Sequence, residues 1–433
     1  MQRIRSVAWI VPVALALGVT SAQAPSPVHL SVDGRASANV GLAVRGNRVA
    51  AAWSARLPDG GMDIYAAVSA DGGRTFGAPV RVNDNPGTAR VNGEMAPRVA
   101  FVPRGKRPFA IDVLWTAREG GGAGSTTTIR VARSVDGGRT FGASRELQRA
   151  GAAGDRGWAA LTADRRGTIH VVWLDHRGMA AARASRDAAA GGAHHHGHAP
   201  TATPAAASDG AAAAQASGLY YSNGSAEREL VKGVCYCCKT ALAAGADGTL
   251  FAAWRHVYAG NMRDIAFTVS RDGGRTFSPA ARVSEDRWQL NGCPDDGPAL
   301  AVDAEGTAHI VWPTVTTQPE PHKAAFYATT RDGKTFTART RVSPTRRNIA
   351  HPQIVVGEDG EVAVFWDEIV NNRRRVFLSR RTESGLFDAP EALSDGTSAS
   401  YPVPVPVPGG LLVAWTEGSG NDSRIVVRRL PLR

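Results

Sequence analysis

A pattern of short apolar segments recurs along the whole chain. Each unit has an apolar segment, a tight turn with glycine and a second apolar segment that ends in tryptophan, as in ALAAGADGTLFAAW, ALAVDAEGTAHIVW and QIVVGEDGEVAVFW. The tryptophans that end these units are Trp53, Trp115, Trp173, Trp254, Trp312, Trp366 and Trp415. Strand-sized alternation with turn residues at short intervals predicts antiparallel β-strands rather than helices.

A second motif follows several of these units. It reads SADGGRTF at 69–76, SVDGGRTF at 134–141, SRDGGRTF at 270–277 and TRDGKTF at 330–336. Its glycines permit positive φ in a tight turn, and its Ser and Asp side chains can hydrogen-bond nearby backbone groups. We therefore expect the motif to hold a turn and to have no catalytic role.

The two repeats together predict an all-β fold, a β-propeller of four-stranded antiparallel blades. A radial array of such sheets closes on itself and protects its edges. Seven tryptophan units predict seven blades, and six is the alternative because the last unit is short and lacks the second motif. That unit, from Tyr401, has room for three strands, and residues 28–32 can supply the fourth. We expect a single propeller domain over residues 25–433.

The first 24 residues are typical of a secretory signal peptide. Arg3 and Arg5 precede an apolar run over 7–19, and small residues (SAQA) follow it. The run is too short to span a bilayer comfortably, and no other stretch is apolar enough for a membrane helix. These residues predict a periplasmic or secreted protein without a membrane span.

The excess of basic residues indicates which kinds of ligand the protein would attract. Lys and Arg number 50 against 39 Asp and Glu, which gives a formal net charge of +11. Such an excess favours anionic ligands. Because no basic helix or basic stripe interleaved with aromatics appears, we expect no nucleic-acid partner. We also expect a monomer.

The alternation of strands sorts the loops to two ends of the propeller. The turns of the second motif lie at one end. The loops after each tryptophan and the starts of the innermost strands lie at the other, which is where loops carry function on a rigid scaffold. Charged residues are dense at this end, and they include Glu94, Asp175, His351 and Asp367.

Four copies of the second motif, known as Asp boxes, in an exported propeller resemble the sialidase (neuraminidase) superfamily. The resemblance covers nearly the whole mature chain as architecture, although that family's enzymes have six blades. It implies an exo-glycosidase in which three arginines grip a carboxylate, Glu activates a Tyr nucleophile, and Asp is the acid/base.

The family's aromatic-Arg-Ile-Pro motif is missing, and Pro97-Arg98-Val99 is the nearest match. The residues available for these roles are Arg98, Arg255 and Arg263 as the clamp, Tyr258 as the nucleophile, and Asp264 or Asp295 as the acid/base. The resemblance thus implies a small anionic or glycan ligand and exo-sialidase activity. A noncatalytic interaction scaffold is an alternative.

Four cysteines form the most unusual feature of the sequence. Cys235, Cys237 and Cys238 lie in the segment that opens the innermost strand of the fourth unit, and Cys293 lies at the matching position of the fifth. Adjacent innermost strands share one rim, so we expect the four to converge. If the first segment is extended, Cys235 and Cys237 point to one side and Cys238 to the other.

Two interpretations of the cysteines stay open. One is a disulfide from Cys293 to one of the other three. The other is a copper or zinc site of clustered thiolates, with His256 as a further ligand. An Ala/Gly-rich insertion at 180–217 contains four histidines, at 194–196 and 198. Such tracts bind metals or form disordered linkers.

Overall fold

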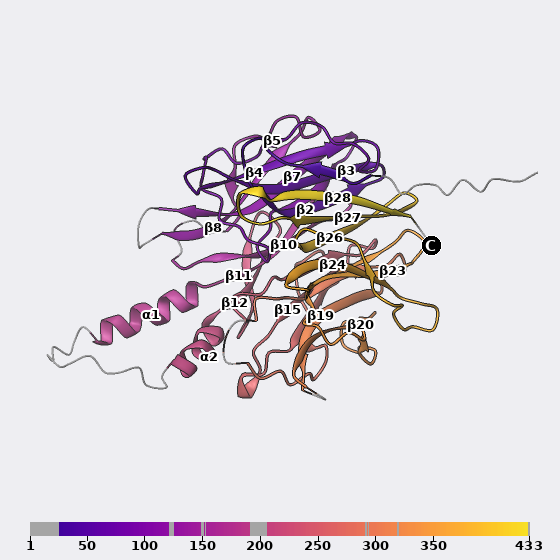
Figure 1. The fold of residues 1–433 in the computed structure, drawn as a ribbon. Coiled ribbons are helices and arrows are strands. Elements are labelled where there is room, and N and C mark those ends of the chain that lie inside the picture. The colour runs from indigo at the N-terminus through magenta and orange to yellow at the C-terminus, as the bar shows by residue number, and fades with distance from the viewer. Residues whose placement is uncertain are drawn as a thin grey trace, which may run out of the picture.

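The computed structural model describes residues 26–120, 125–148, 151, 153–190, 206–290, 292, 294–317 and 320–431. These residues form seven four-stranded antiparallel sheets arranged as a β-propeller (Figure 1). The predicted fold class and the count of seven blades are confirmed.

The first three blades take up the N-terminal half of the propeller. Blade 1 comprises β2 (Ser37–Arg45), β3 (Arg48–Arg56), β4 (Met62–Ser69) and β5 (Val80–Arg81). Blade 2 comprises β6 (Arg98–Arg104), β7 (Arg107–Glu119), β8 (Thr126–Ser134) and β9 (Arg145–Glu146). Blade 3 comprises β10 (Arg156–Ala163), β11 (Ile169–Asp175), β12 (Gly218–Ser222) and β13 (Glu227–Lys232).

The other four blades follow the same order from the innermost to the outermost strand. Blade 4 comprises β14 (Ala241–Ala244), β15 (Leu250–Arg255), β16 (Ile265–Ser270) and β17 (Ala281–Arg282). Blade 5 comprises β18 (Ala299–Val302), β19 (Ala308–Thr316), β20 (His322–Thr330) and β21 (Thr340–Arg341). Blade 6 comprises β22 (Ala350–Val356), β23 (Val362–Val370), β24 (Arg373–Arg380) and β25 (Glu391–Ala392). Blade 7 comprises β26 (Ala399–Val407), β27 (Gly410–Glu417), β28 (Arg424–Pro431) and β1 (Val28–Leu30).

Blade 7 closes the ring with strands from both ends of the chain. β1 pairs antiparallel with β28, with Val28 opposite Val427 and Leu30 opposite Ile425. The N-terminal segment thus supplies the missing fourth strand, as the sequence predicts. Innermost strands of consecutive blades contact one another all the way round, including β26 with β2, and they enclose a central channel.

Apolar side chains fill the space between neighbouring blades. The seven predicted tryptophans lie on the second strand of each blade and are at most 2% exposed. One core cluster, for example, packs Phe267 of blade 4 with Trp312 and Phe326 of blade 5. The repeating apolar alternation is therefore explained by burial of both faces of each sheet.

The Asp boxes lie in the turns between the third and fourth strands. In the first box, the backbone N–H groups of Arg74 and Thr75 donate to the Asp71 carboxylate at 2.9 Å, and the Thr75 hydroxyl donates at 2.6 Å. Ser69 Oγ accepts the Gly73 N–H at 2.8 Å. The side chains of the box hold the turn, as predicted from their chemistry.

A helical insertion separates β11 from β12. It contains α1 (Arg177–Ala190) and α2 (Ala206–Ala216), which project from the side of the propeller in Figure 1. The four histidines of the insertion and the predicted signal peptide lie outside the described residues. Two short 3-10 turns lie at Ala259–Asn261 and Gly420–Asp422. Among the described residues, no helix has the length and apolar character needed to cross a membrane.

Candidate functional site

Four blades begin their innermost strand with a bulge whose residue has positive φ. These residues are Asn39 in blade 1, Trp158 in blade 3, His351 in blade 6 and Tyr401 in blade 7, with φ from 53° to 58°. The strand register shifts at each of them. Bulges re-aim side chains and cluster near active sites, and a non-glycine residue at positive φ carries strain. The bulges identify the channel mouth on the loop-rich face as the candidate site.

His351 and Tyr401 form a stacked pair at this mouth. Their ring centroids lie 3.7 Å apart with planes at 27°. Asp367, which directly follows Trp366 in β23, fixes both residues, because its Oδ2 lies 2.7 Å from His351 Nδ1 and accepts the Tyr401 N–H at 2.9 Å. Arg374 pairs with the other oxygen of Asp367. The pair is therefore preorganised by one buried carboxylate.

Burial and the surrounding carboxylates act on Tyr401. Desolvation raises the pKa of its phenol well above the ordinary range, and Glu94 is the largest of the charges that raise it further. A side chain at Gly93 would collide with the Tyr401 ring, so this glycine leaves the space that the ring occupies. The phenol is consequently protonated at neutral pH.

A buried ionic network links blade 2 to blades 4, 5 and 6. Glu94 Oε2 accepts the backbone N–H groups of Lys239 and Gly297, both at 3.0 Å. Lys239 Nζ lies 3.4 Å from Glu94 Oε1. Asp296 accepts Lys323 Nζ at 2.8 Å and the His351 N–H at 3.1 Å. The loops that form the mouth are thus joined to one another through ionic and backbone hydrogen bonds.

Asp295 differs from the other carboxylates of the mouth because it is exposed. Its φ of 46° also lies in the left-handed region. Partial burial, and then the charge of Glu94, raise its pKa. An accessible carboxyl group that keeps its proton to higher pH than usual suits a proton donor. This residue was among the acid/base candidates from the sequence.

Two basic side chains line the channel below the mouth. A cavity of about 150 Å³ is lined by residues of five blades, among them Arg98, Lys239 and Gln353. Arg98 Nε donates to the Ala159 carbonyl at 2.8 Å, and burial lowers the pKa of its guanidinium. Of the three predicted clamp arginines, Arg98 is the one that lines this channel.

Arg255 and Arg263 are fully buried and have other partners. Arg255 donates to the carbonyls of Asp296, Arg263 and Pro313. Arg263 Nη1 donates to Cys235 Sγ at 3.2 Å. These three arginines are therefore not brought together as a carboxylate clamp.

Tyr258 and Asp264 lie together on the outer part of blade 4. Arg282 pairs with the buried Asp264 carboxylate, and its guanidinium lies 4.4 Å from the Tyr258 ring centroid. Burial raises the pKa of Tyr258 to about 12. The backbone N–H groups of Arg287 and Trp288 also donate to Asp264. Asp264 thus holds the loop that precedes blade 5 and is not free to act as an acid.

The three cysteines of blade 4 converge in a turn rather than along an extended strand. The turn at Tyr236 and Cys237 brings Cys238 Sγ to 3.6 Å from Cys235 Sγ, although extended backbone would point them to opposite sides. Cys237 Sγ lies 3.8 Å from Cys235 Sγ. Cys237 is disulfide-bonded, whereas Cys235 and Cys238 are free and buried. Cys293 lies outside the described residues.

Electrostatics separate the two free thiols. The hydrogen bond from Cys238, followed by the charges of Arg263 and Arg255, lowers the pKa of Cys235 to about 6 against the opposing effect of burial. Burial raises the pKa of Cys238, as does the neighbouring Cys235. Among the residues that the structure describes, the group of side chains close enough to hold a metal consists of Cys235, Cys237 and Cys238, without His256. Burial lowers the pKa of His256 to about 4, so its imidazole is neutral at pH 7.

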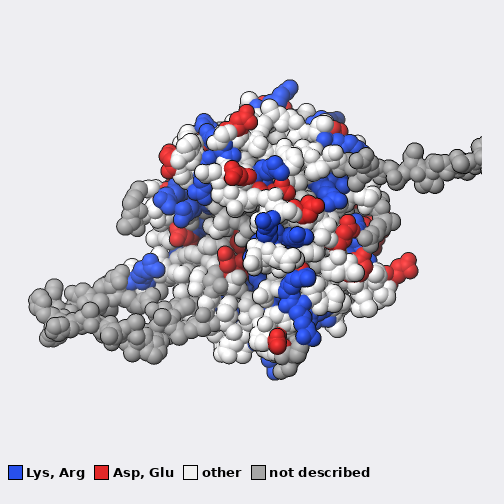
Figure 2. All heavy atoms as spheres, in the orientation of Figure 1, with Lys and Arg blue, Asp and Glu red and all other residues white. Residues whose placement is uncertain are grey.

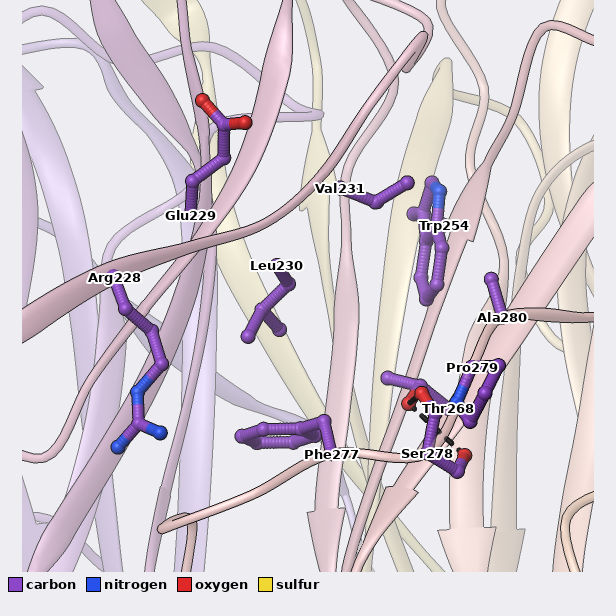
Figure 3. Close-up of a pocket in the computed structure, with 10 residues that line it drawn as sticks. All are labelled: Arg228, Glu229, Leu230, Val231, Trp254, Thr268, Phe277, Ser278, Pro279 and Ala280. Carbon is purple, nitrogen blue, oxygen red and sulfur yellow. Dashed lines mark hydrogen bonds between the residues drawn. The ribbon is translucent and has the colours of Figure 1, made fainter.

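Other cavities lie away from the mouth. One of about 370 Å³ opens between β13 and the outer part of blade 4, and Figure 3 shows Trp254 and Phe277 on its wall. Its polar lining consists of Arg228, Glu229, Thr268 and Ser278, and the hydroxyls of the last two bond to each other at 3.2 Å. On the face in view in Figure 2, basic and acidic side chains are interspersed.

Comparisons with known proteins identify the fold. No protein-family model matches the sequence, and no curated protein matches it. An ulvan lyase of polysaccharide lyase family 25 is similar in structure with a TM-score of 0.53 and 12% identity, over 92% of this chain and 94% of that one. The GH93 α-L-arabinofuranosidase of Fusarium graminearum has a TM-score of 0.51 and 13% identity, over 94% and 97%.

A Hadza microbial sialidase is also similar, with a TM-score of 0.47 and 15% identity over 92% of this chain and 66% of that one. At these identities the likeness shows the β-propeller fold alone. The comparisons therefore support a β-propeller and do not show the sialidase superfamily.

The prediction from sequence missed Tyr401 and Lys239 as site residues. A signal for Tyr401 exists, because Ser400-Tyr401-Pro402 occupies the same place in blade 7 as Ala350-His351-Pro352 in blade 6. Lys239 follows the cysteines directly, and nothing in the sequence pairs it with a residue 145 positions away.

Proposed function

We propose that the protein is an exported propeller that binds a saccharide at the channel mouth and delivers a proton to its glycosidic oxygen. The observation that carries the proposal is the Tyr401–His351 stack, fixed by Asp367, beside the exposed Asp295. Export rests on the composition of residues 1–24, which is typical of a signal peptide.

The residues of the mouth have complementary roles in this proposal. The partly exposed Tyr401 ring offers an apolar surface for a sugar ring, and its protonated phenol donates a hydrogen bond to a sugar oxygen. Asp295 is the general acid, because its raised pKa keeps its carboxyl group protonated to a higher pH than that of an ordinary aspartate. His351 and Asp367 position Tyr401.

Sialic acid is a less favoured ligand than an uncharged or uronic saccharide. A sialic-acid carboxylate requires convergent guanidinium groups, and Arg255 and Arg263 donate to backbone carbonyls and to a thiol instead. Arg98, whose Nε donates to a backbone carbonyl, lines the channel and suits a single acidic group. Exo-sialidase activity is therefore tested as one outcome of the same experiment.

The experiment is a binding and cleavage panel with the mature protein. Three probes cover the chemistry: an aryl α-sialoside, arabinobiose, and ulvan as a sulfated polysaccharide that contains uronic acid. We expect binding and cleavage of arabinobiose or ulvan. Cleavage of the sialoside alone would replace our ligand assignment with the sialidase one, and a folded protein inert to all three would refute the proposal.

Variants of the acid and the platform distinguish this site from any other. Asp295→Asn should lower the rate of cleavage by about 10²-fold or more, a loss typical of a general acid. Tyr401→Phe should weaken binding and leave the fold intact. Asp395→Asn, which removes an exposed carboxylate in the loop before β26, is the matched control and should behave as the wild type.

A further inference from the structure

The guanidinium of Arg263 is buried without a carboxylate partner among the described residues, and a thiolate could supply the negative charge that it lacks. Arg263 is 0% exposed, and among the residues that the structure describes no carboxylate pairs with it. Its Nη1 donates to Cys235 Sγ at 3.2 Å, while Nε and Nη2 have no hydrogen-bond partner. A buried cation needs a counter-charge, because isolated burial is costly. Cys235 is placed to supply that charge as a thiolate.

The second thiol completes a two-sulfur site. Cys238 Sγ lies 3.6 Å from Cys235 Sγ and donates its proton to it. Both are at most 2% exposed and pack with Val257 and with Ala214 of α2. Cys237 is close by, but its sulfur is in a disulfide and offers no thiolate. The site thus offers two soft donors in an apolar pocket.

We propose that Cys235 and Cys238 bind one Cu(I) ion, which takes the place of the proton that Cys238 donates to Cys235. The thiolate–thiol pair carries one negative charge, and so does a complex of two thiolates with a monovalent ion. Binding therefore releases one proton, leaves the charge beside Arg263 unchanged, and involves no change of oxidation state. Thiolates are soft ligands that select such an ion.

The charge balance at Arg263 disfavours zinc. A divalent ion with two thiolates is neutral and leaves the Arg263 charge without a partner. Zinc in structural sites takes four ligands, and this pocket supplies two thiolates among apolar neighbours. This inference is independent of the carbohydrate proposal, because it uses neither the channel mouth nor its residues.

The test is an anaerobic titration of the whole mature protein with Cu(I), supplied with the chelator bathocuproine disulfonate as competitor. We expect one copper per chain. In the wild type, bound Cu(I) should protect both Cys235 and Cys238 from alkylation by N-ethylmaleimide, read by mass spectrometry. Zn(II) should protect neither. The alkylation readout needs no substitution, so it decides the question even where a serine variant does not fold.

Cysteine variants distinguish a site made of two thiolates from one that also needs Cys237 or Cys293. Cys235→Ser and Cys238→Ser should each weaken Cu(I) binding by more than about 100-fold. This loss is larger than that expected when a residue that only hydrogen-bonds a metal ligand is replaced. The double substitution Cys237→Ser with Cys293→Ser should keep one copper per chain. Loss of copper in that double variant would overturn the two-thiolate site. A wild type that leaves all Cu(I) on the chelator, or that holds a Cys235–Cys238 disulfide, would also overturn it.

Discussion

The backbone and side chain of Tyr401 are held by separate contacts. Its φ of 56° lies in the left-handed region, which costs free energy for a tyrosine. The N–H bond to Asp367 and the stack on His351 offset that cost. Because these partners come from blade 6, the orientation of Tyr401 depends on the packing of two blades.

Substitution of Gly93 should move Tyr401 without touching a ligand. In Gly93→Ala the new methyl group would occupy the space of the Tyr401 ring, and the ring, as the end of a side chain, is the part that yields. We expect weaker saccharide binding, comparable to that of Tyr401→Ala, with a thermal unfolding midpoint near that of the wild type. Unchanged binding would show that the position of the ring is irrelevant.

Removal of Lys239 should destabilise the fold. Lys239→Met leaves the Glu94 carboxylate, which is 1% exposed, with backbone donors but no cation. Breaking a buried pair by removing one partner costs about 3–5 kcal/mol. The measurement is the free energy of unfolding in urea for the wild type, Lys239→Met and the double variant with Glu94→Gln. A loss of less than about 1 kcal/mol in the single variant would argue against a buried ion pair.

At the residue scale the sequence predicts residue types better than partners. Asp295 is exposed at the mouth, as an acid/base must be, because its position before β18 follows from the repeat. Arg255 and Arg263 also lie near this face, but Arg255 donates hydrogen bonds to backbone carbonyls and Arg263 donates to Cys235. Those contacts join segments far apart in the chain, and no local pattern encodes them.

At the scale of single elements, the Asp boxes are the clearest case of local chemistry that fixes structure. Hydrogen bonds from Thr75 and then Ser69 lower the pKa of Asp71, and similar bonds lower the pKa of Asp136, Asp272 and Asp332. The hydrogen bonds to the Asp71 carboxylate all come from residues within four positions of it. This is why the motif could be interpreted correctly from the sequence.

The boxes should make stability depend on pH in acid. The pKa of Asp71 is lower in the folded protein than in the unfolded chain, where it is near 4. The ionised carboxylate therefore stabilises the fold fully above the unfolded pKa. This stabilisation is lost as the pH falls through the folded-state pKa. We expect the wild type to exceed Asp71→Asn in unfolding free energy at pH 6. This difference should shrink toward pH 2. A difference that stays constant with pH would mean that the ionised carboxylate does not contribute.

The turn at the cysteines is the element that the sequence does not predict. Alternation suggests a strand from Val234 onward, but the innermost strand of blade 4 begins only at Ala241. Bonds from Cys235 N–H to the Arg255 carbonyl and from Thr240 N–H to the Trp158 carbonyl hold the segment on both sides. Since these partners come from β15 and β10, tertiary contacts decide the local structure.

At the scale of the whole molecule, the ring is closed by three residues of β1. The pairing of β1 with β28 gives blade 7 its outermost strand and packs Leu30, which is 5% exposed, into a core with Val427 and Trp53. Seven repeats and the short last unit make this closure predictable. The described residues form one ring of seven blades.

Truncation of Leu30 should weaken the closure. Leu30→Ala removes a buried side chain at the junction of the chain ends, and such changes cost about 2–5 kcal/mol. Leu386→Ala is the matched control, because Leu386 is 62% exposed. We expect a lower thermal midpoint for the first variant and a wild-type midpoint for the second. Equal midpoints for both variants would show that β1 does not secure the ring.

The central claim is that the chemistry of this propeller lies at the channel mouth, where strained residues of several blades converge. A crystal structure of the wild type soaked with the panel saccharide that it binds tests this most directly. We predict electron density for a sugar ring against Tyr401, with the glycosidic oxygen within hydrogen-bond distance of Asp295. Density confined to the Asp-box end, or to the cavity between blades 3 and 4, would contradict the account.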